Sequence, residues 1–242
     1  MPLPADSPLT RINDEMPPVP SRRRAPYRLV LLAGLGLDAR SWQRVLARLP
    51  ADIDASVVPL PGAGLRAPVP RLEGLAALLC DRMGEGPLVL AGHSQGCQVA
   101  AAAAGDPRVR GLVLLGPSTD PRLRSPAGLV ARWLRTALAE PWWQVPLILA
   151  QWARTGPRRM VALWRASAPD RIDRRLRAVA VPVVVVRGSR DRLCDADWAA
   201  VLATAAPDGR LVELPGAAHM TPQTRPAEVA RLLRDAVHEV EP

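Results

Sequence analysis

The chain has 242 residues, 48% of them hydrophobic, which is enough to build one sizeable folded domain. No apolar run reaches the roughly 18 residues that a membrane span requires, so we expect no transmembrane segment. The formal net charge is +9, but every basic residue is an arginine, the arginines are spread along the chain, and no known nucleic-acid-binding module is present. We therefore expect no nucleic-acid partner.

Residues 1–26 differ in composition from the rest of the chain. They contain seven prolines and the basic cluster Ser21-Arg-Arg-Arg24, without a helical or strand period, which predicts a flexible tail. The arginines and the apolar stretch 29–37 together resemble a twin-arginine export signal. That stretch is, however, expected to supply a core strand, and no convincing cleavage site follows it. We therefore expect a cytoplasmic protein.

Short apolar runs then alternate with helical patterns along the chain. Strands are predicted at 28–32, 87–91, 111–115, 181–186 and 211–214, and helices near 38–49, 70–83, 95–104, 195–205 and 226–239. This alternation favours an α/β fold with a mostly parallel sheet that is covered on both faces. The three cysteines, Cys80, Cys97 and Cys194, have neither paired nor metal-like spacing, which fits a reducing cytoplasm, and we expect no metal site. We also expect no cofactor.

Ser94 lies between a predicted strand and a predicted helix, within Gly92-His93-Ser94-Gln95-Gly96. Glycine two residues away on either side removes the Cβ atoms that would collide in a very sharp turn. This pattern is typical of a nucleophile elbow, which presents the serine hydroxyl above the carboxyl edge of the sheet. The alternative is a glycine-rich strand–helix turn without chemistry. We interpret Ser94 as a nucleophile.

A nucleophilic serine needs a base within hydrogen-bond reach, and the chain offers three histidines. The side chain of His93 is expected to leave the elbow on the side opposite the serine hydroxyl. His238 lies among charged residues near the end of the last predicted helix. His219 follows the strand 211–214 and a turn, so it lies on a loop at the carboxyl end of a late strand. His219 is the predicted base.

The base in turn needs an orienting acid. The β-branched run 181–186 predicts a buried strand, and Asp191 lies on the loop that leaves its carboxyl end. The chain order Ser94, Asp191, His219 is the one expected for a nucleophile from an early strand and an acid and base from later strands. Asp120, which follows another predicted strand, is a second candidate acid.

Acyl transfer also needs donors for the oxyanion. One is expected to be the backbone N–H of Gln95, the residue after the nucleophile. The other is expected from the loop Ala33-Gly34-Leu35-Gly36 after the first strand, with the N–H of Leu35 as the candidate.

These motifs together resemble the α/β-hydrolases, in particular their compact, lid-bearing esterase and acyltransferase-like branch. The matching segments occur in the family's order over roughly residues 27–240, as Gly34-Leu35-Gly36 with Trp42, Leu60-Pro61-Gly62-Ala63-Gly64, Gly92-His93-Ser94-Gln95-Gly96, Gly188-Ser189-Arg190-Asp191 and Pro215-Gly216-Ala217-Ala218-His219. The chain has Ala33-Gly34 where many relatives have His-Gly, and Gly62-Ala63-Gly64 where they often have Gly-His-Gly. The resemblance implies a doubly wound, mostly parallel sheet with an inserted helical lid.

The segment 120–178 is predicted to form this lid, inserted into a core made of residues 27–119 and 179–242. It carries twelve arginines against four acidic residues, and five of the seven tryptophans of the chain: Trp133, Trp142, Trp143, Trp152 and Trp164. The tryptophans could hold the lid helices together while the arginines are solvated on their outer faces. Alternatively, the tryptophans line a pocket for a bulky apolar acyl group, with an arginine-rich rim for an anionic group. Residues 141–146 are the best candidate for the lining.

We therefore expect a serine hydrolase that cleaves a carboxylic ester or thioester of a hydrophobic acyl substrate through an acyl-enzyme intermediate. A thioesterase would use the same residues, and a basic lid suits an acidic acyl-carrier protein or a coenzyme A thioester. A carbon–carbon hydrolase or a cyclase could reuse the pocket. A non-catalytic small-molecule binder on the same scaffold is the alternative from a different class of protein.

Overall fold

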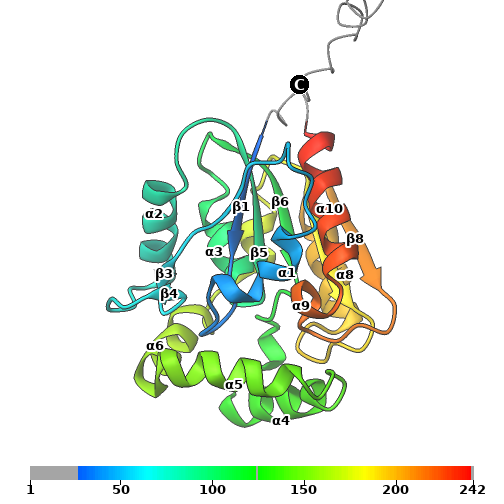
Figure 1. Ribbon diagram of the computed structural model, residues 1–242. Coiled ribbons are helices and arrows are strands. Elements are labelled where there is room, and N and C mark those ends of the chain that lie inside the picture. Colours follow the sequence, from blue (N-terminus) through cyan, green and yellow to red (C-terminus); the bar gives the residue numbers. More distant parts are fainter. Residues whose placement is uncertain (1–26, 124, 241–242) are drawn as a thin grey trace, which may run out of the picture.

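A six-stranded parallel sheet forms the centre of the residues that the structure describes, 27–123 and 125–240 (Figure 1). The computed structural model has the strand order β2-β1-β5-β6-β7-β8. The strands are β1 (Arg28–Leu32), β2 (Ala55–Val57), β5 (Leu88–His93), β6 (Val109–Leu115), β7 (Val183–Gly188) and β8 (Gly209–Leu214). The predicted tail, residues 1–26, lies outside the described residues. The predicted α/β fold with a parallel sheet is confirmed.

The central strands are buried because helices cover both faces of the sheet. Every residue of β5 and β7 is buried, as expected for a parallel strand, and this explains why both appear in the sequence as nearly continuous apolar runs. The sequence did not predict the edge strand β2, whose three residues are only half-buried and form no apolar run. It also did not predict the short pair β3 (Leu60–Pro61) and β4 (Gly64–Leu65).

Two groups of helices pack on the two faces of the sheet. One face is covered by α2 (Leu72–Arg82), α3 (Gln95–Ala103), α7 (Ile172–Leu176) and α8 (Ala196–Ala205). The other is covered by the turn η1 (Ala39–Ser41) with α1 (Gln43–Leu46), α9 (Thr221–Thr224) and α10 (Pro226–Glu239). The helix α10 buries Val229, Leu233 and Val237, three residues at helical spacing, against the sheet.

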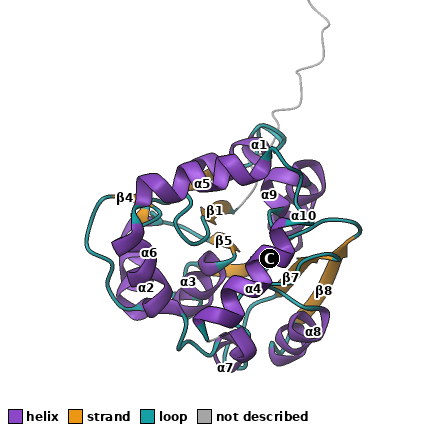
Figure 2. Cartoon of the chain, turned by 90° about the horizontal axis from the view of Figure 1, so that it is seen from below, coloured by secondary structure: helices purple, strands orange, loops and turns teal. Residues whose placement is uncertain are grey.

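Three further helices lie along the carboxyl edge of the sheet (Figure 1). They are α4 (Pro126–Ala137), α5 (Gln144–Thr155) and α6 (Pro157–Ser167), and we call residues 125–167 the cap. Figure 2, seen from the side of the cap, shows these helices around the ends of β1 and β5. Both α4 and α6 begin with a proline in their first turn, where the missing N–H costs no helical hydrogen bond.

The predicted lid extended further than the cap, over 120–178, and its last helix packs differently. Residues Ile172 and Leu176 of α7 are fully buried between α3 and α8, so α7 belongs to the core rather than to the cap. The turn η2 (Pro121–Leu123) connects β6 to the cap. No helix within the described ranges is long and apolar enough to cross a membrane.

Candidate active site

Ser94 has the strained backbone that its sequence motif predicts. Its φ is +52°, which makes it the single non-glycine residue with positive φ in the described part of the chain. A Cβ atom at Gly92 would lie 2.5 Å from the backbone N of Cys97, and one at Gly96 would lie 2.7 Å from the carbonyl oxygen of Leu32. Only glycine fits at these two positions, since real Cβ atoms do not approach backbone so closely. A residue held in such a conformation stores about 1–3 kcal/mol.

Asp191 and His219 form a buried pair at the carboxyl ends of β7 and β8. The carboxylate Oδ2 of Asp191 lies 2.7 Å from Nδ1 of His219. The other oxygen, Oδ1, accepts the N–H groups of Leu193 at 2.8 Å and Cys194 at 3.1 Å. With Oδ1 fixed by two backbone donors, the carboxylate can take only one orientation toward the imidazole, and an ionised Asp191 places the proton of His219 on Nδ1.

The electrostatics of this pair suit a base. Burial works against ionisation of Asp191, but the charge and hydrogen bond of His219 and the two N–H donors outweigh it and lower the pKa of Asp191. Burial also works against protonation of His219, but the charge and hydrogen bond of Asp191, together with the charge of Glu140, raise the pKa of His219. An Nδ1 that carries a proton leaves Nε2 free to accept one.

Ser94 and His219 line one cavity of about 240 Å³ between the sheet edge and the cap. Oγ of Ser94 lies 3.3 Å from Oγ of Ser118, and either hydroxyl can donate. Ser118 was missed by the sequence analysis, although its place just after β6, a strand adjacent to the one that carries the elbow, could have indicated it.

The ring of His93 packs against that of the predicted base. Its centroid lies 5.0 Å from the centroid of the His219 ring, and His93 is among the residues that line the cavity. Its Nε2 lies 3.0 Å from the carbonyl oxygen of His219 and therefore donates to it. Burial lowers the pKa of His93 to about 3, helped by the charge of His219, so His93 is a neutral support for the His219 loop.

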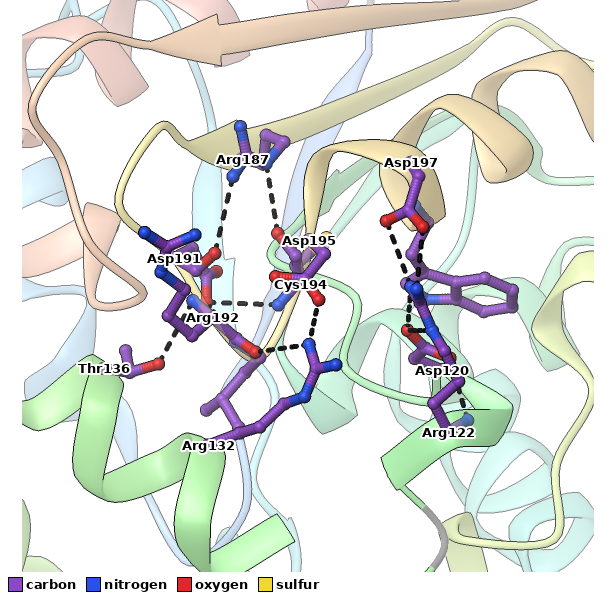
Figure 3. A network of polar contacts seen from close by, with 12 residues as sticks. Asp120, Arg122, Arg132, Thr136, Arg187, Asp191, Arg192, Cys194, Asp195 and Asp197 are labelled. Carbon is purple, nitrogen blue, oxygen red and sulfur yellow. Dashed lines mark hydrogen bonds and ion pairs between the residues drawn. The ribbon is translucent and has the colours of Figure 1, made fainter. Parts of the chain in front are cut away.

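Asp120, the second candidate acid, is buried, but its carboxylate pairs with Arg122 rather than with His219. Both of its oxygens accept from Arg122, with Nε at 2.7 Å from Oδ2, and Arg122 also pairs with Asp197 of α8 (Figure 3). Asp120 lines the cavity, but the carboxylate that binds Nδ1 of His219 is that of Asp191. The geometry thus favours Asp191 as the partner of His219.

The two residues predicted to donate to the oxyanion, Leu35 and Gln95, both line the cavity. Gln95 is the first residue of α3, so its N–H has no partner within the helix and lies at the positive end of the helix dipole. Leu35 also lines the cavity, and its carbonyl oxygen accepts Nε1–H of Trp152 at 2.9 Å. This hydrogen bond fixes the peptide on one side of Leu35.

The five tryptophans of the predicted lid divide into two groups. Trp133, Trp152 and Trp164 line the cavity, and the rings of Trp133 and Trp152 pack at 5.2 Å. Trp142 is instead 84% exposed, and the ring of Trp143 lies 4.4 Å from the guanidinium of Arg44. The expectation that 141–146 lines the pocket is therefore wrong for Trp142 and Trp143, because the turn before α5 directs them outward; only Val145 of this segment reaches the cavity.

Hydrogen bonds connect the cap to each of the four loops that carry candidate catalytic groups. Besides the Trp152 bond to the Leu35 loop, the amide Nε2 of Gln95 donates to the Leu163 carbonyl at 2.8 Å. The N–H groups of Arg192 and Met220, next to the predicted acid and base, bind Oγ1 of Thr136 in α4 at 3.2 Å and Oε1 of Glu140, three residues beyond α4, at 2.7 Å. Figure 3 shows the hydrogen bond between Thr136 and Arg192, and beside it the ion pair of Arg132 with Asp195. The cap therefore contributes to the geometry of the site.

Among the described residues, no group of three or more histidine, cysteine, aspartate or glutamate side chains is arranged to hold a metal ion.

Residues 29–232 match the alpha/beta hydrolase family. The lipase LipV of Mycobacterium tuberculosis is 30% identical over 249 residues, covering 86% of this chain and 92% of that lipase. Among solved structures, a thermophilic esterase from Thermogutta terrifontis aligns with a TM-score of 0.71 at 21% identity, over 91% and 92% of the two chains. The esterase RhEst1 from Rhodococcus sp. aligns with a TM-score of 0.67 at 22% identity, over 90% and 93%. Because the family match spans most of the sequence, and the relatives are covered nearly from end to end, the chain belongs to the alpha/beta hydrolase family.

Proposed function

We propose that the protein is a serine esterase that hydrolyses carboxylic esters of apolar acids through an acyl-enzyme intermediate. The single observation that carries this proposal is the buried pair of Asp191 and His219, with Oδ2 2.7 Å from Nδ1, in which His219 lines the same cavity as a serine held at φ +52°. The names of the relatives point the same way, since one is a lipase and two are esterases.

In the proposed reaction, Nε2 of His219 accepts the hydroxyl proton of Ser94 as Oγ attacks the ester carbonyl carbon. Asp191 holds the tautomer of the imidazole and stabilises its cation. The N–H groups of Leu35 and Gln95 bind the oxyanion. His219 then returns the proton to the departing alkoxide, and the same imidazole activates a water molecule that hydrolyses the acyl-enzyme.

The cavity supports an apolar acyl group of modest length. Its walls include Leu37, Ile148 and Val145 as well as Trp133, Trp152 and Trp164, which we propose as substrate-binding residues. Its volume of about 240 Å³ lies below the roughly 300–1,000 Å³ of typical small-molecule sites. We therefore expect short and medium acyl chains to be preferred over long ones.

The test is a panel of chromogenic esters with acyl chains of graded length, measured with the wild-type protein and with Ser94→Ala. We expect wild-type kcat/KM to rise with chain length and then to fall, and the variant to lose at least about a thousandfold. A wild-type protein that hydrolyses no ester in the panel would contradict the proposal.

A thioesterase is the second candidate, favoured by the charge of the cap. On α4, α5 and α6 the side chains of Arg135, Arg154, Arg158 and Arg165 are exposed, whereas Glu140, the one acidic residue of the cap, is buried. A surface of this charge would attract an acidic acyl-carrier protein or a coenzyme A thioester. A kcat/KM higher for acyl-coenzyme A than for the matching ester, and falling steeply with salt, would favour this candidate.

A further inference from the structure

Glu140 is a buried acidic residue that the cap places at the active site. It lies three residues beyond the end of α4, and its N–H donates to the carbonyl oxygen of Thr136, in the last turn of that helix, at 3.1 Å. Its side chain is only 8% exposed and lines the same cavity as Ser94 and His219. Glu140 is also the one acidic residue between Asp120 and Asp170.

The two carboxylate oxygens of Glu140 have different surroundings. Oε1 accepts the backbone N–H of Met220, the residue next to His219, at 2.7 Å. Oε2 is shielded from solvent and has no hydrogen-bond partner among the described residues. A buried carboxylate with only one hydrogen bond is costly unless a positive charge lies nearby. Burial accordingly raises the pKa of Glu140, while the Met220 N–H and the charge of His219 favour its ionised form.

Two other ionisable groups near His219 do not supply a charge that stabilises its protonated form. His93 packs against the imidazole but is neutral, because burial holds its pKa near 3. Asp120 also lines the cavity, but its negative charge is balanced by the ion pair with Arg122. The charged groups that face a protonated His219 are therefore Asp191, which binds Nδ1, and Glu140.

We propose that Glu140 is a second carboxylate partner of His219, a positioning residue supplied by the cap, which holds the His219 loop through Met220 and stabilises the imidazolium that forms during catalysis. This proposal rests on the proposed function for the importance of His219, but the coupling between Glu140 and His219 is a property of the folded protein alone. Because Glu140 belongs to the cap, the basicity of His219 would depend on the cap being in place.

Two substitutions separate the two contributions of Glu140. Glutamine has the same size and can still accept the Met220 N–H through its amide oxygen, so Glu140→Gln removes the charge and keeps the tether. Glu140→Ala removes both. The matched control is Glu73→Gln, which deletes a carboxylate on the exposed side of α2 that pairs with Arg175.

The direct measurement is the titration of the histidine ring signals by NMR in the full chain without substrate. The chain has three histidines, so the His219 signal is identified by its absence in His219→Gln. We expect the pKa of His219 to fall in Glu140→Gln by roughly 0.5 to 1 unit and to stay unchanged in Glu73→Gln. An unchanged His219 titration in Glu140→Gln, with only a lower melting temperature, would show that Glu140 is a structural tether and would overturn the proposal.

Ester hydrolysis gives a second readout. The acid limb of the kcat/KM profile should move to lower pH in Glu140→Gln, with kcat reduced by roughly threefold to tenfold and KM unchanged. Glu140→Ala should lose more of kcat, since the Met220 tether is lost as well. If the protein hydrolyses no ester at any pH, the proposed function fails, whereas the NMR titration still decides whether Glu140 and His219 are coupled.

Discussion

Gly116 leaves the space into which the imidazole of His219 fits. A Cβ atom at Gly116 would lie 3.0 Å from both Nδ1 and Cε1 of His219 and 3.2 Å from Oδ2 of Asp191. The residue also has a φ of +59°, which glycine adopts without strain. The loop after β6 therefore contacts the Asp191–His219 pair closely at Gly116.

Gly116→Ala should displace the imidazole and lower kcat/KM by roughly tenfold to a hundredfold, since small misplacements of catalytic groups are costly. The matched control is Gly105→Ala, because a Cβ at Gly105 meets nothing within 4 Å. Both variants are compared by ester hydrolysis and by melting temperature. Full activity in Gly116→Ala would mean that the position of His219 is not restricted by this contact.

The choice of Asp191 over Asp120 as the orienting acid gives a paired prediction. Asp191→Asn should lower kcat by about a thousandfold or more, because an asparagine cannot hold the required imidazole tautomer. Asp120→Asn should weaken only the contacts of Arg122 and change kcat severalfold at most. The reverse order of the two effects in steady-state kinetics would assign the acid to Asp120.

Trp152 should affect the rate through the Leu35 loop rather than through binding alone. Trp152→Phe keeps an aromatic wall but removes the Nε1–H that binds the Leu35 carbonyl. We expect kcat to fall about tenfold, because the aim of the Leu35 N–H at the oxyanion is loosened. Trp142→Phe is the control, since that side chain lies outside the cavity and is exposed. If Trp152→Phe and Trp142→Phe have equal kcat values, the hydrogen bond from Trp152 does not contribute to oxyanion binding.

The pH dependence follows from the raised pKa of His219. Only the neutral imidazole can accept the proton of Ser94, and a raised pKa keeps His219 protonated to a higher pH. The value of kcat/KM should therefore rise with pH, with a midpoint above the ordinary value of 6.5. The control His238→Gln, at the exposed end of α10, should leave the midpoint unchanged. A midpoint clearly below 6.5 would contradict the electrostatic account of the pair.

The location of the candidate site could be predicted from the sequence because local patterns determine it. Ser94, Asp191 and His219 each lie on the turn or loop that follows a strand, and parallel strands bring those loops to one edge of the sheet. Gly96 is required by the close approach of the Leu32 and Ala33 backbone at the end of β1, whereas Gly92 is required by backbone contacts within the same turn. Such short-range constraints leave a direct trace in the residue pattern.

The contents of the cavity could not be predicted in the same way. The sequence shows that 120–178 is rich in tryptophan, but it does not show which way each ring points. That direction depends on the conformation of the turn between α4 and α5, which is why Trp142 and Trp143 were wrongly predicted to line the cavity. The role of Glu140 depends on a contact with Met220, 80 residues later in the chain. Long-range packing of this kind has no local signal beyond one acidic residue among arginines.

The central claim is that Ser94 is a nucleophile activated by His219, and a fluorophosphonate probe tests it most directly. The probe should react with the wild-type protein at one residue, Ser94 by peptide mass spectrometry, and labelling should be lost in Ser94→Ala and His219→Ala, both still folded by circular dichroism. A folded wild-type protein that resists the probe, or a label on any other residue, would contradict the account.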